Sequence, residues 1–229
     1  MILDSAQKIQ NKKLKSVFSA KEISDMDLFD TVYPKSVIPV DGTVLYYGKI
    51  LSTEEANHYF EKFITSIEWK NDEAIIFGKR IITKRKVAWY GDEGYSYTYS
   101  NTTKTALAWT KELLQLKSKI EEISGVTYNS CLLNLYHSGE EGVSWHSDDE
   151  KCLGEEPNIA SISLGAERNF TFKHKTTKQT MSIFLENGSL LIMKDKTQSN
   201  WLHSILKTKK ITRPRISLTF RKMFEENNH

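Results

Sequence analysis

The sequence predicts an α+β protein whose core is a jelly roll of short β-strands. From residue 127 onward, short segments alternate apolar and polar residues and are separated by Gly, Asn, Asp and Glu turns, a pattern typical of a sandwich or barrel. Two segments with helical spacing come before them, which places helices ahead of the sheets. Hydrophobic residues make up 39% of the 229 residues, so a sizeable packed core is possible.

The beginning of the chain is expected to lie outside that core. Residues 1–40 are polar and lysine-rich without a clear period, and we expect an N-terminal arm there, followed by one folded domain over 41–229. The first strand is expected over 43–51. Ser52 is followed three residues later by Glu55, the spacing of a capping box, which predicts that a helix begins here.

A second helix is expected over 103–123, because apolar residues recur there every three or four positions and Gly125 follows. Between the two helices, residues 74–100 break into short β-like pieces. The strands expected after residue 127 have the sequences SCLLNLYHS, NIASISLGA, NFTFKHK, TMSIFLE, GSLLIMK, NWLHSIL and RISLTFRKM.

Composition narrows the class of protein. The net charge of +3 comes from mixed acids and bases, which permits a nucleic-acid partner without requiring one. Cys131 and Cys152 lack the spacing of a disulfide framework, so we expect free thiols and an intracellular protein. There is no run of about eighteen apolar residues and no apolar signal region at the N-terminus, so we expect neither a membrane span nor secretion.

Alternation along the strands sorts polar side chains onto single faces. Asn134 and Tyr136 point to one side of their strand, and Arg215 and Arg221 point to one side of the last strand. A solvated outer face accounts for each pair, and so does a polar interior between two sheets. The pattern alone leaves both interpretations open.

The segment WHSDDE raises the possibility of a metal site. His146 and Asp148 are two residues apart, so an extended chain points both to one side. Among the six histidines, His203 is the best-placed third ligand, in an apolar strand late in the chain. Two histidines and one carboxylate suit Fe(II), because they leave adjacent positions open for oxygen chemistry. The alternative is a solvated loop that holds the pair by chance.

The two arginines favour an interior location for the polar face of the last strand. A buried arginine is costly unless it meets an anion. The guanidinium fork of Arg215 matches a dicarboxylate ligand. The alternative is a basic edge strand that faces water or phosphate.

In combination, these motifs resemble the AlkB family of Fe(II)/2-oxoglutarate nucleic-acid dealkylases over about residues 43–225. The motifs, in family order, are N-L-Y (134–136), H-S-D-D-E (146–150), P-N-I-A-S-I-S-L-G (157–165), G-S-L-L-I-M (188–193), W-L-H-S (201–204) and R-I-S-L-T-F-R (215–221). Family members often carry Asn where Ser217 stands, a departure that leaves both arginines intact. The stretches I-F-G-K (76–79) and Y-G-D-E-G-Y-S-Y-T-Y-S (90–100) look most like the branch that repairs duplex DNA.

This resemblance implies a double-stranded β-helix with a β-hairpin nucleotide-recognition lid over about 70–102. The implied cofactors are Fe(II), the cosubstrate 2-oxoglutarate and O2. The implied iron ligands are His146, Asp148 and His203. The residues implied for the 2-oxoglutarate pocket are Arg215, Arg221, Asn134 and Tyr136.

The substrate implied by the resemblance is alkylated DNA with the target base flipped out of the helix stack. Tyr97 and Tyr99 are expected to stack on that base together with the ring of His146. Phe77 is expected to fill the gap that the base leaves; the alternative is that it packs on the core. Asp149 is expected to favour a cationic methylated base and to accept its amino hydrogens.

The implied activity is oxidative demethylation of 1-methyladenine and 3-methylcytosine in DNA, which releases formaldehyde. Glu150 is expected to support the substrate loop, and Arg168 to contact phosphate unless it is ordinary surface charge. The alternatives are an RNA demethylase of the same family, a 2-oxoglutarate oxygenase acting on protein or lipid, and a nucleic-acid-binding module with a degenerate site. We expect a monomer without membrane association, in the nucleus of a eukaryote or the cytoplasm of a bacterium.

Overall fold

The structure is a computed structural model that describes residues 34–76, 79–92, 96–99 and 102–224. The side chains of residues 73–81 and 93–104 fall outside this description. A folded unit begins at Lys35, and Ile38 already belongs to its buried core. The boundary predicted after residue 40 therefore lies a few residues earlier.

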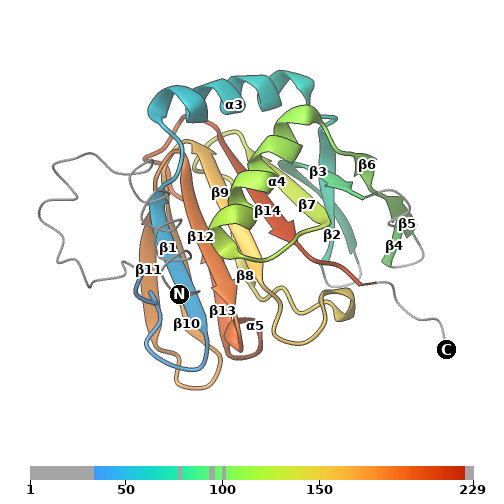
Figure 1. Cartoon of the computed structure of the whole chain (residues 1–229). Coiled ribbons are helices and arrows are strands. Elements are labelled where there is room, and N and C mark those ends of the chain that lie inside the picture. Colours follow the sequence, from blue (N-terminus) through green and yellow to red (C-terminus); the bar gives the residue numbers. More distant parts are fainter. Residues whose placement is uncertain (1–33, 77–78, 93–95, 100–101, 225–229) are drawn as a thin grey trace, which may run out of the picture. The chain divides into compact units, whose positions relative to one another are not determined.

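Two mostly antiparallel β-sheets form the body of this unit (Figure 1). The larger sheet has the order β1-β12-β9-β14-β7-β3-β2, with β6 paired to β3. Its strands are β1 (Thr43–Lys49), β2 (Lys70–Ile76), β3 (Lys79–Gly91), β6 (Leu107–Ala108), β7 (Ser130–Tyr136), β9 (Ile159–Gly165), β12 (Ser189–Lys194) and β14 (Arg215–Arg221). The smaller sheet has the order β11-β10-β13-β8. Its strands are β8 (Val143–His146), β10 (Arg168–His174), β11 (Thr180–Leu185) and β13 (Trp201–Ile205).

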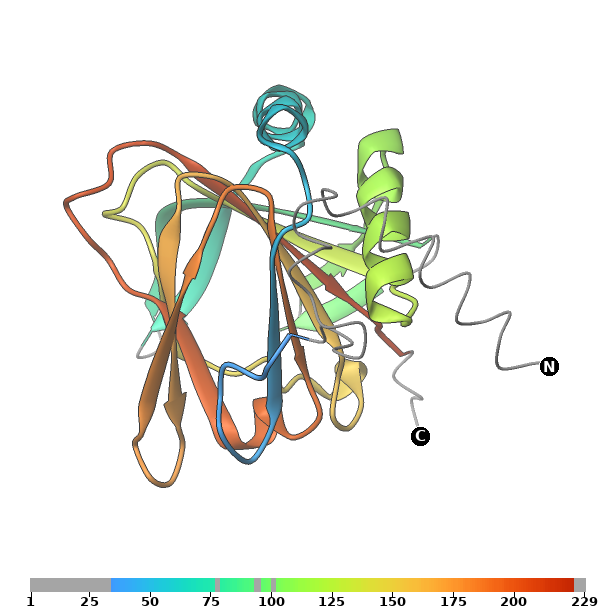
Figure 2. The same cartoon turned by 60° about the vertical axis from the view of Figure 1, so that its left-hand side comes forward.

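The two faces of the larger sheet bury different side chains. Ile216 and Leu218 of β14 pack toward the helices in one core cluster. On the opposite face of β12, Met193 packs with Phe172 and Trp201 of the smaller sheet in a second cluster between the sheets, and Figure 2 shows the two layers of strands. The polar faces of β7 and β14 turn toward that interior, so the solvated-face alternative is wrong and the jelly-roll prediction is confirmed.

Helix α3 (Thr53–Ser66) begins with the predicted capping box. The Ser52 Oγ accepts a hydrogen bond from the Glu55 N–H at 3.1 Å, and a Glu55 carboxylate oxygen accepts one from the Ser52 N–H at 2.8 Å. Both bonds satisfy N–H groups that the first helical turn leaves unpaired. Phe63 and Ala56 carry the buried face of α3 onto the larger sheet.

Helix α4 (Lys111–Ser124) is shorter than the helix predicted over 103–123. The Thr110 Oγ1 accepts a hydrogen bond from the Leu113 N–H at 3.2 Å, which fixes the start of the helix. The segment before this cap is β5 (Thr102–Thr105) followed by β6. The helix was predicted to begin too early because Trp109 fits the apolar spacing of a helix. In the structure Trp109 lies before α4 and packs against Phe220. Gly125 ends α4 with φ 71°, as predicted.

The region predicted as a recognition lid has two parts. β2 and β3 extend the larger sheet beyond β7, whereas β4 (Ser96–Tyr99) pairs with β5 as a separate two-stranded sheet. Phe77 lies outside the described residues, as do the side chains of Tyr97 and Tyr99. Their roles therefore stay predictions.

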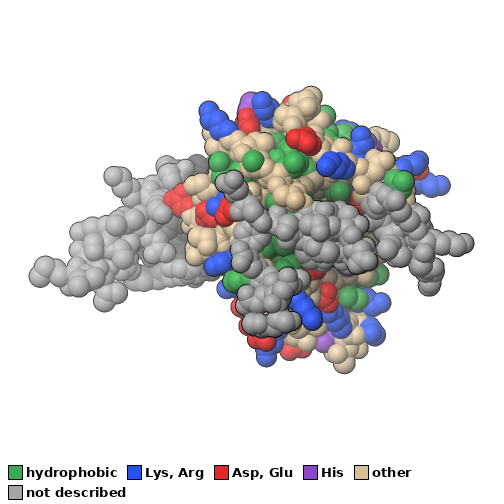
Figure 3. All heavy atoms as spheres, turned by 90° about the vertical axis from the view of Figure 1, so that its right-hand side faces the viewer, with side chains coloured by type: hydrophobic (Ala, Val, Ile, Leu, Met, Phe, Trp, Pro, Cys, Tyr) green, Lys and Arg blue, Asp and Glu red, His purple; other side chains and the backbone are tan. Residues whose placement is uncertain are grey.

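The side of the unit that carries β4 and β5 presents side chains of both charges, with lysine and arginine at several places among the described residues (Figure 3). This agrees with a composition of 32 basic and 29 acidic residues. Within the described part of the chain, no helix is long and apolar enough to cross a membrane.

Candidate metal and cosubstrate site

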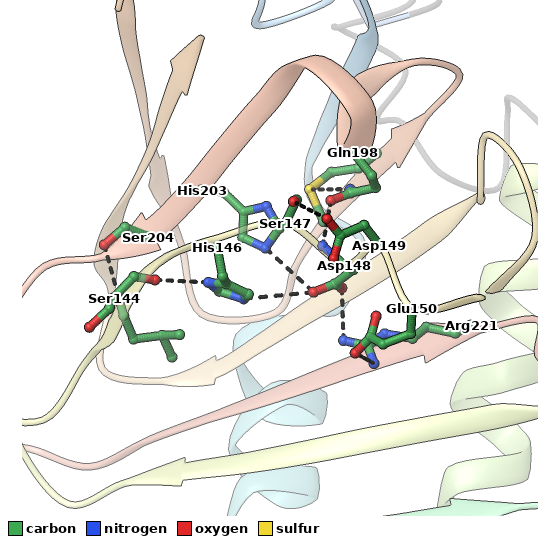
Figure 4. A network of polar contacts seen from close by, with 12 residues as sticks. Ser144, His146, Ser147, Asp148, Asp149, Glu150, Gln198, His203, Ser204 and Arg221 are labelled. Carbon is green, nitrogen blue, oxygen red and sulfur yellow. Dashed lines mark hydrogen bonds and ion pairs between the residues drawn. The ribbon is translucent and has the colours of Figure 1, made fainter. Parts of the chain in front are cut away.

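Two neighbouring strands bring the predicted metal ligands together. His146 ends β8 and lies opposite His203 of β13 in the strand register, with their ring centroids 4.3 Å apart. Asp148 follows β8, and its Oδ1 lies 3.7 Å from His146 Nε2 and 3.8 Å from His203 Nε2. One ligand atom from each residue lies within 4.8 Å of the others (Figure 4). The three predicted ligands are thus assembled in one cluster.

The histidine rings are prepared to offer nitrogen lone pairs. The Ser144 carbonyl lies 2.8 Å from His146 Nδ1, so that nitrogen donates its hydrogen and Nε2 is left free to bind a metal. Burial lowers the pKa of His203 to about 3, so its ring is neutral at physiological pH. A neutral imidazole is the form that binds metal ions.

Asp148 is held from two sides, which leaves one oxygen for a metal. Its Oδ2 accepts a hydrogen bond from Arg221 Nη2 at 2.7 Å, and its backbone N–H donates to Gln198 Oε1 at 2.9 Å. Burial acts to raise the pKa of Asp148, but Arg221 and the two histidines outweigh it and keep the pKa below its ordinary value. The ionised Oδ1 faces the imidazoles, so two nitrogens and one carboxylate oxygen fit an Fe(II) ion.

Arg215 occupies the interior further along the same sheet face. Its side chain is 1% exposed, and its Nη2 donates to Ser163 Oγ at 2.9 Å. Its Nε and Nη1 are buried without a hydrogen-bond partner. Buried donors of this kind are costly unless an anion satisfies them, and their fork geometry matches a carboxylate. Arg215 therefore fits one carboxylate of 2-oxoglutarate.

The other residues predicted for the cosubstrate pocket line the same interior. The Tyr136 ring centre lies 5.5 Å from Arg215 Cζ, and these two residues are paired across β7 and β14. Asn134 is paired with Ser217 two positions further along, and both are buried. Burial also lowers the pKa of Arg215 to about 10, which still leaves the guanidinium charged at neutral pH.

Gly165 allows the strands around Arg215 to approach closely. It pairs with Arg215 across β9 and β14 and has φ 81°. A Cβ at this position would lie 2.6 Å from the Phe60 ring and 2.7 Å from the Pro214 carbonyl oxygen. Any other residue here would strain the backbone and displace the beginning of β14.

Arg168 is not a surface phosphate contact, and that prediction is wrong. Its side chain is 2% exposed. Its guanidinium donates to the backbone carbonyls of Glu141 at 3.1 Å and Leu206 at 2.9 Å, and more weakly to those of Ser138 and Gly139. Arg168 therefore holds the loop after β7 against the loop after β13.

Arg221 has a contact that the sequence did not predict. In addition to its contact with Asp148, Arg221 has its Nη1 4.0 Å from Glu150 Oε1. The Arg221 Nε and the Glu150 Oε2 are buried without a partner.

Asp149 is exposed and accepts a hydrogen bond from Ser147 Oγ at 3.1 Å. Both acids thus follow the metal ligand directly, and their roles toward a substrate remain predictions.

Gln198 is a residue of the site that the sequence does not reveal. It lies in the short helix α5 (Thr197–Asn200), just before the strand of His203. The residue is buried, and its side chain contacts the Asp148 backbone (Figure 4). No spacing marks it, because the contact joins segments distant in the chain.

Comparison with known proteins identifies the family. Residues 43–221 match the model of the 2OG-Fe(II) oxygenase superfamily. The chain is 36% identical to alpha-ketoglutarate-dependent dioxygenase alkB homolog 3 of Homo sapiens over 206 residues, which cover 85% of this chain and 71% of that protein. It is 33% identical to DNA oxidative demethylase ALKBH2 of Homo sapiens over 197 residues, 81% of this chain and 76% of that protein.

The fold also resembles the solved structure of OsALKBH1, with a TM-score of 0.58 at 14% identity, covering 81% of this chain and 99% of that one. At this identity the likeness supports the jelly-roll architecture alone. The family match and the identity to alkB homologues place the chain more narrowly. The chain belongs to the AlkB family of 2-oxoglutarate- and Fe(II)-dependent oxygenases.

Proposed function

We propose that this protein is a dioxygenase that removes methyl groups from N-alkylated bases of DNA, with 1-methyladenine and 3-methylcytosine as substrates. The observation that carries the proposal is one buried interior holding both a His-Asp-His cluster and an arginine with two unpartnered guanidinium nitrogens. The similarity to DNA oxidative demethylase ALKBH2 and to alkB homolog 3 supports DNA as the substrate.

His146, Asp148 and His203 would hold Fe(II), and Arg215 would bind the distal carboxylate of 2-oxoglutarate. Bound together with O2, the metal and cosubstrate supply the oxidation of an N-alkyl carbon. The expected products are formaldehyde and the unmethylated base, with succinate and CO2 from 2-oxoglutarate. The chain's own residues keep the cosubstrate fixed: Tyr136 packs beside Arg215, and Asn134 lines the same interior.

Two acids next to the metal ligand suit a cationic methylated base. We propose that Asp149 accepts the amino hydrogens of the base, because its exposed carboxylate directly follows Asp148. Glu150 keeps its carboxylate near Arg221 and supports this loop. Tyr97 and Tyr99 would stack on the flipped base, with the exposed side of the His146 ring.

We further propose that the protein acts as a monomer inside the cell, in the nucleus of a eukaryote or the cytoplasm of a bacterium. A reducing compartment suits Cys131, whose thiol is free and buried in the structure.

The experiment is formaldehyde release and 2-oxoglutarate turnover on methylated single- and double-stranded DNA and on matching RNA. We expect release with DNA oligonucleotides that carry either lesion, and none with the unmethylated sequence or with His203→Ala. Turnover confined to RNA, or to a methylated peptide or lipid in parallel assays, would overturn the choice of substrate. The metal and cosubstrate assignments would survive that result.

A single variant tests whether the protein acts on duplex DNA with Phe77 filling the gap that the flipped base leaves. An inserted side chain matters only where a partner strand must be kept apart from the flipped base. Phe77→Ala should therefore lower demethylation of duplex DNA and leave single-stranded DNA unaffected. Equal losses on both substrates would show that Phe77 packs in the core.

A further inference from the structure

Asp148 lies in a segment without regular secondary structure, which follows the last residue of β8. Asp148 is only 4% exposed, so its backbone N–H needs a hydrogen-bond acceptor from the protein. A buried N–H without a partner costs about 1–3 kcal/mol. The side-chain oxygen of Gln198, 2.9 Å away, satisfies it (Figure 4).

The chemistry of these groups fixes the orientation of the Gln198 amide. A backbone N–H can only donate, so the amide must present Oε1 to Asp148. Its Nε2 then points the other way and donates to the Met193 sulfur at 3.6 Å. Gln198 is 2% exposed, so both contacts lie in the interior.

The short helix that carries Gln198 is itself anchored to a distant part of the chain. Thr197 Oγ1 accepts from the Thr43 N–H at 2.9 Å and donates to the Lys194 carbonyl. Gly42 allows this approach, because a Cβ there would lie 2.6 Å from Thr197 Oγ1. The Lys175 ammonium donates to the backbone carbonyl of Gln198 at 2.8 Å. The acceptor offered to Asp148 is therefore a fixed one.

We propose that Gln198 is a positioning residue of the metal centre, whose amide oxygen fixes the backbone of Asp148 against the turn that leads into the strand of His203. Arg221 fixes Oδ2 of the same carboxylate. With both contacts made, Oδ1 is held toward the two imidazoles. The inference rests on the metal centre alone and is independent of which nucleic acid is the substrate.

The competing explanation is that Gln198 only fills space in the second core cluster, next to Met193. The two explanations differ in what they predict for metal binding. Partners of metal ligands typically change metal affinity by about 10–100-fold when they are removed. A residue that only packs would change the stability of the metal-free fold and leave the affinity of the folded protein intact.

The test is titration of the folded, metal-free protein with Mn(II), with free Mn(II) followed by electron paramagnetic resonance. Gln198→Met keeps the length of the side chain and removes the acceptor; we expect Mn(II) binding about tenfold weaker or more. Met193→Leu is the matched control, since it removes the sulfur contact and keeps the Asp148 contact. We expect its Mn(II) affinity to match that of the unchanged protein.

Unchanged Mn(II) affinity in folded Gln198→Met would overturn the proposal. An equal loss in Met193→Leu would do so too, because core packing would then explain the effect. Melting of both metal-free variants shows whether they are folded at the titration temperature.

A second measurement needs no variant and keeps the proposal open to refutation if Gln198→Met does not fold. Amide hydrogen exchange of the unchanged metal-free protein should show the Asp148 N–H protected, although no strand pairs it. Exchange at the rate of an unstructured peptide would mean that the Gln198 contact is not formed, and the proposal would fail.

Discussion

Arg215 and Arg221 lie at opposite ends of one strand and on the same face of it, yet their surroundings differ. Arg221 donates to the Asp148 carboxylate at 2.7 Å and lies near Glu150. Arg215 has no carboxylate partner among the described residues and keeps two buried nitrogens without any hydrogen bond. Arg221 is thus paired with a carboxylate of the protein and leaves one buried nitrogen, Nε, without a partner, whereas Arg215 leaves two and has no carboxylate among the described residues.

This difference shows how a buried arginine is best interpreted. Strand alternation places both side chains on one face of β14, and residue type makes both of them anion binders. The number of guanidinium nitrogens without a hydrogen-bond partner distinguishes the two roles. An arginine that positions another side chain uses its donors within the protein, whereas an arginine that binds a ligand keeps donors for that ligand. On this criterion we expect Arg215 to bind the cosubstrate and Arg221, which contacts Asp148, to support the metal ligand.

The largest expected effect is the loss of a predicted metal ligand, next to the Asp148 carboxylate that Arg221 holds. His203→Ala removes one of the three predicted ligands, so turnover on methylated DNA should fall to background while the protein stays folded. The measurement is formaldehyde release, with His58→Ala as a control because His58 is an exposed histidine on α3. Near-normal turnover in His203→Ala would remove this residue from the site.

The next effect concerns the cosubstrate side. Arg215→Met should raise the KM for 2-oxoglutarate about tenfold or more, because a charged hydrogen bond is worth about 1.5–3 kcal/mol and 1.4 kcal/mol is tenfold. Arg215→Lys should recover only part of the loss, since an ammonium group cannot reproduce the fork. Steady-state kinetics at saturating Fe(II) measure both. An unchanged KM would contradict the role of the unpartnered nitrogens.

A smaller effect is expected at the substrate side, where neither arginine acts. Asp149→Asn should lower kcat/KM for 1-methyladenine about tenfold, through loss of a charge-assisted hydrogen bond to a cationic base. Decarboxylation of 2-oxoglutarate without substrate should continue, because Asp148 is untouched. If that uncoupled reaction also collapsed, Asp149 would belong to the metal centre instead.

The smallest effect should come from Arg168, a buried arginine that we expect to play no part in catalysis. Arg168→Met leaves the carbonyls of Glu141 and Leu206 without their donor. Each such loss costs about 1–3 kcal/mol, so the melting temperature should drop. The KM for DNA should be unchanged at a temperature where the variant is folded. A raised KM with unchanged melting would restore Arg168 as a phosphate contact.

These three arginines also show what the sequence can and cannot predict. Period-two alternation predicted the strands and the shared face of Arg215 and Arg221 on β14, because it depends on local geometry alone. The cost of burying an arginine without an anion then favoured the interior for that face. The capping box at Ser52 was predictable for the same reason. The partners of Arg168 and Gln198 were not, because they depend on loops that meet only in the folded chain. The early start predicted for α4 failed because Trp109 packs outside the helix whose spacing it shares.

We expect the two arginines of β14 to have separate tasks, and a pair of titrations distinguishes these tasks. Mn(II) binding and then 2-oxoglutarate binding are measured on Arg215→Met and Arg221→Met, each in the folded protein. Arg215→Met should bind Mn(II) normally and 2-oxoglutarate about tenfold more weakly or worse. Arg221→Met should bind Mn(II) about tenfold more weakly. Normal Mn(II) binding by Arg221→Met, or equal losses of both ligands in Arg215→Met, would contradict the account.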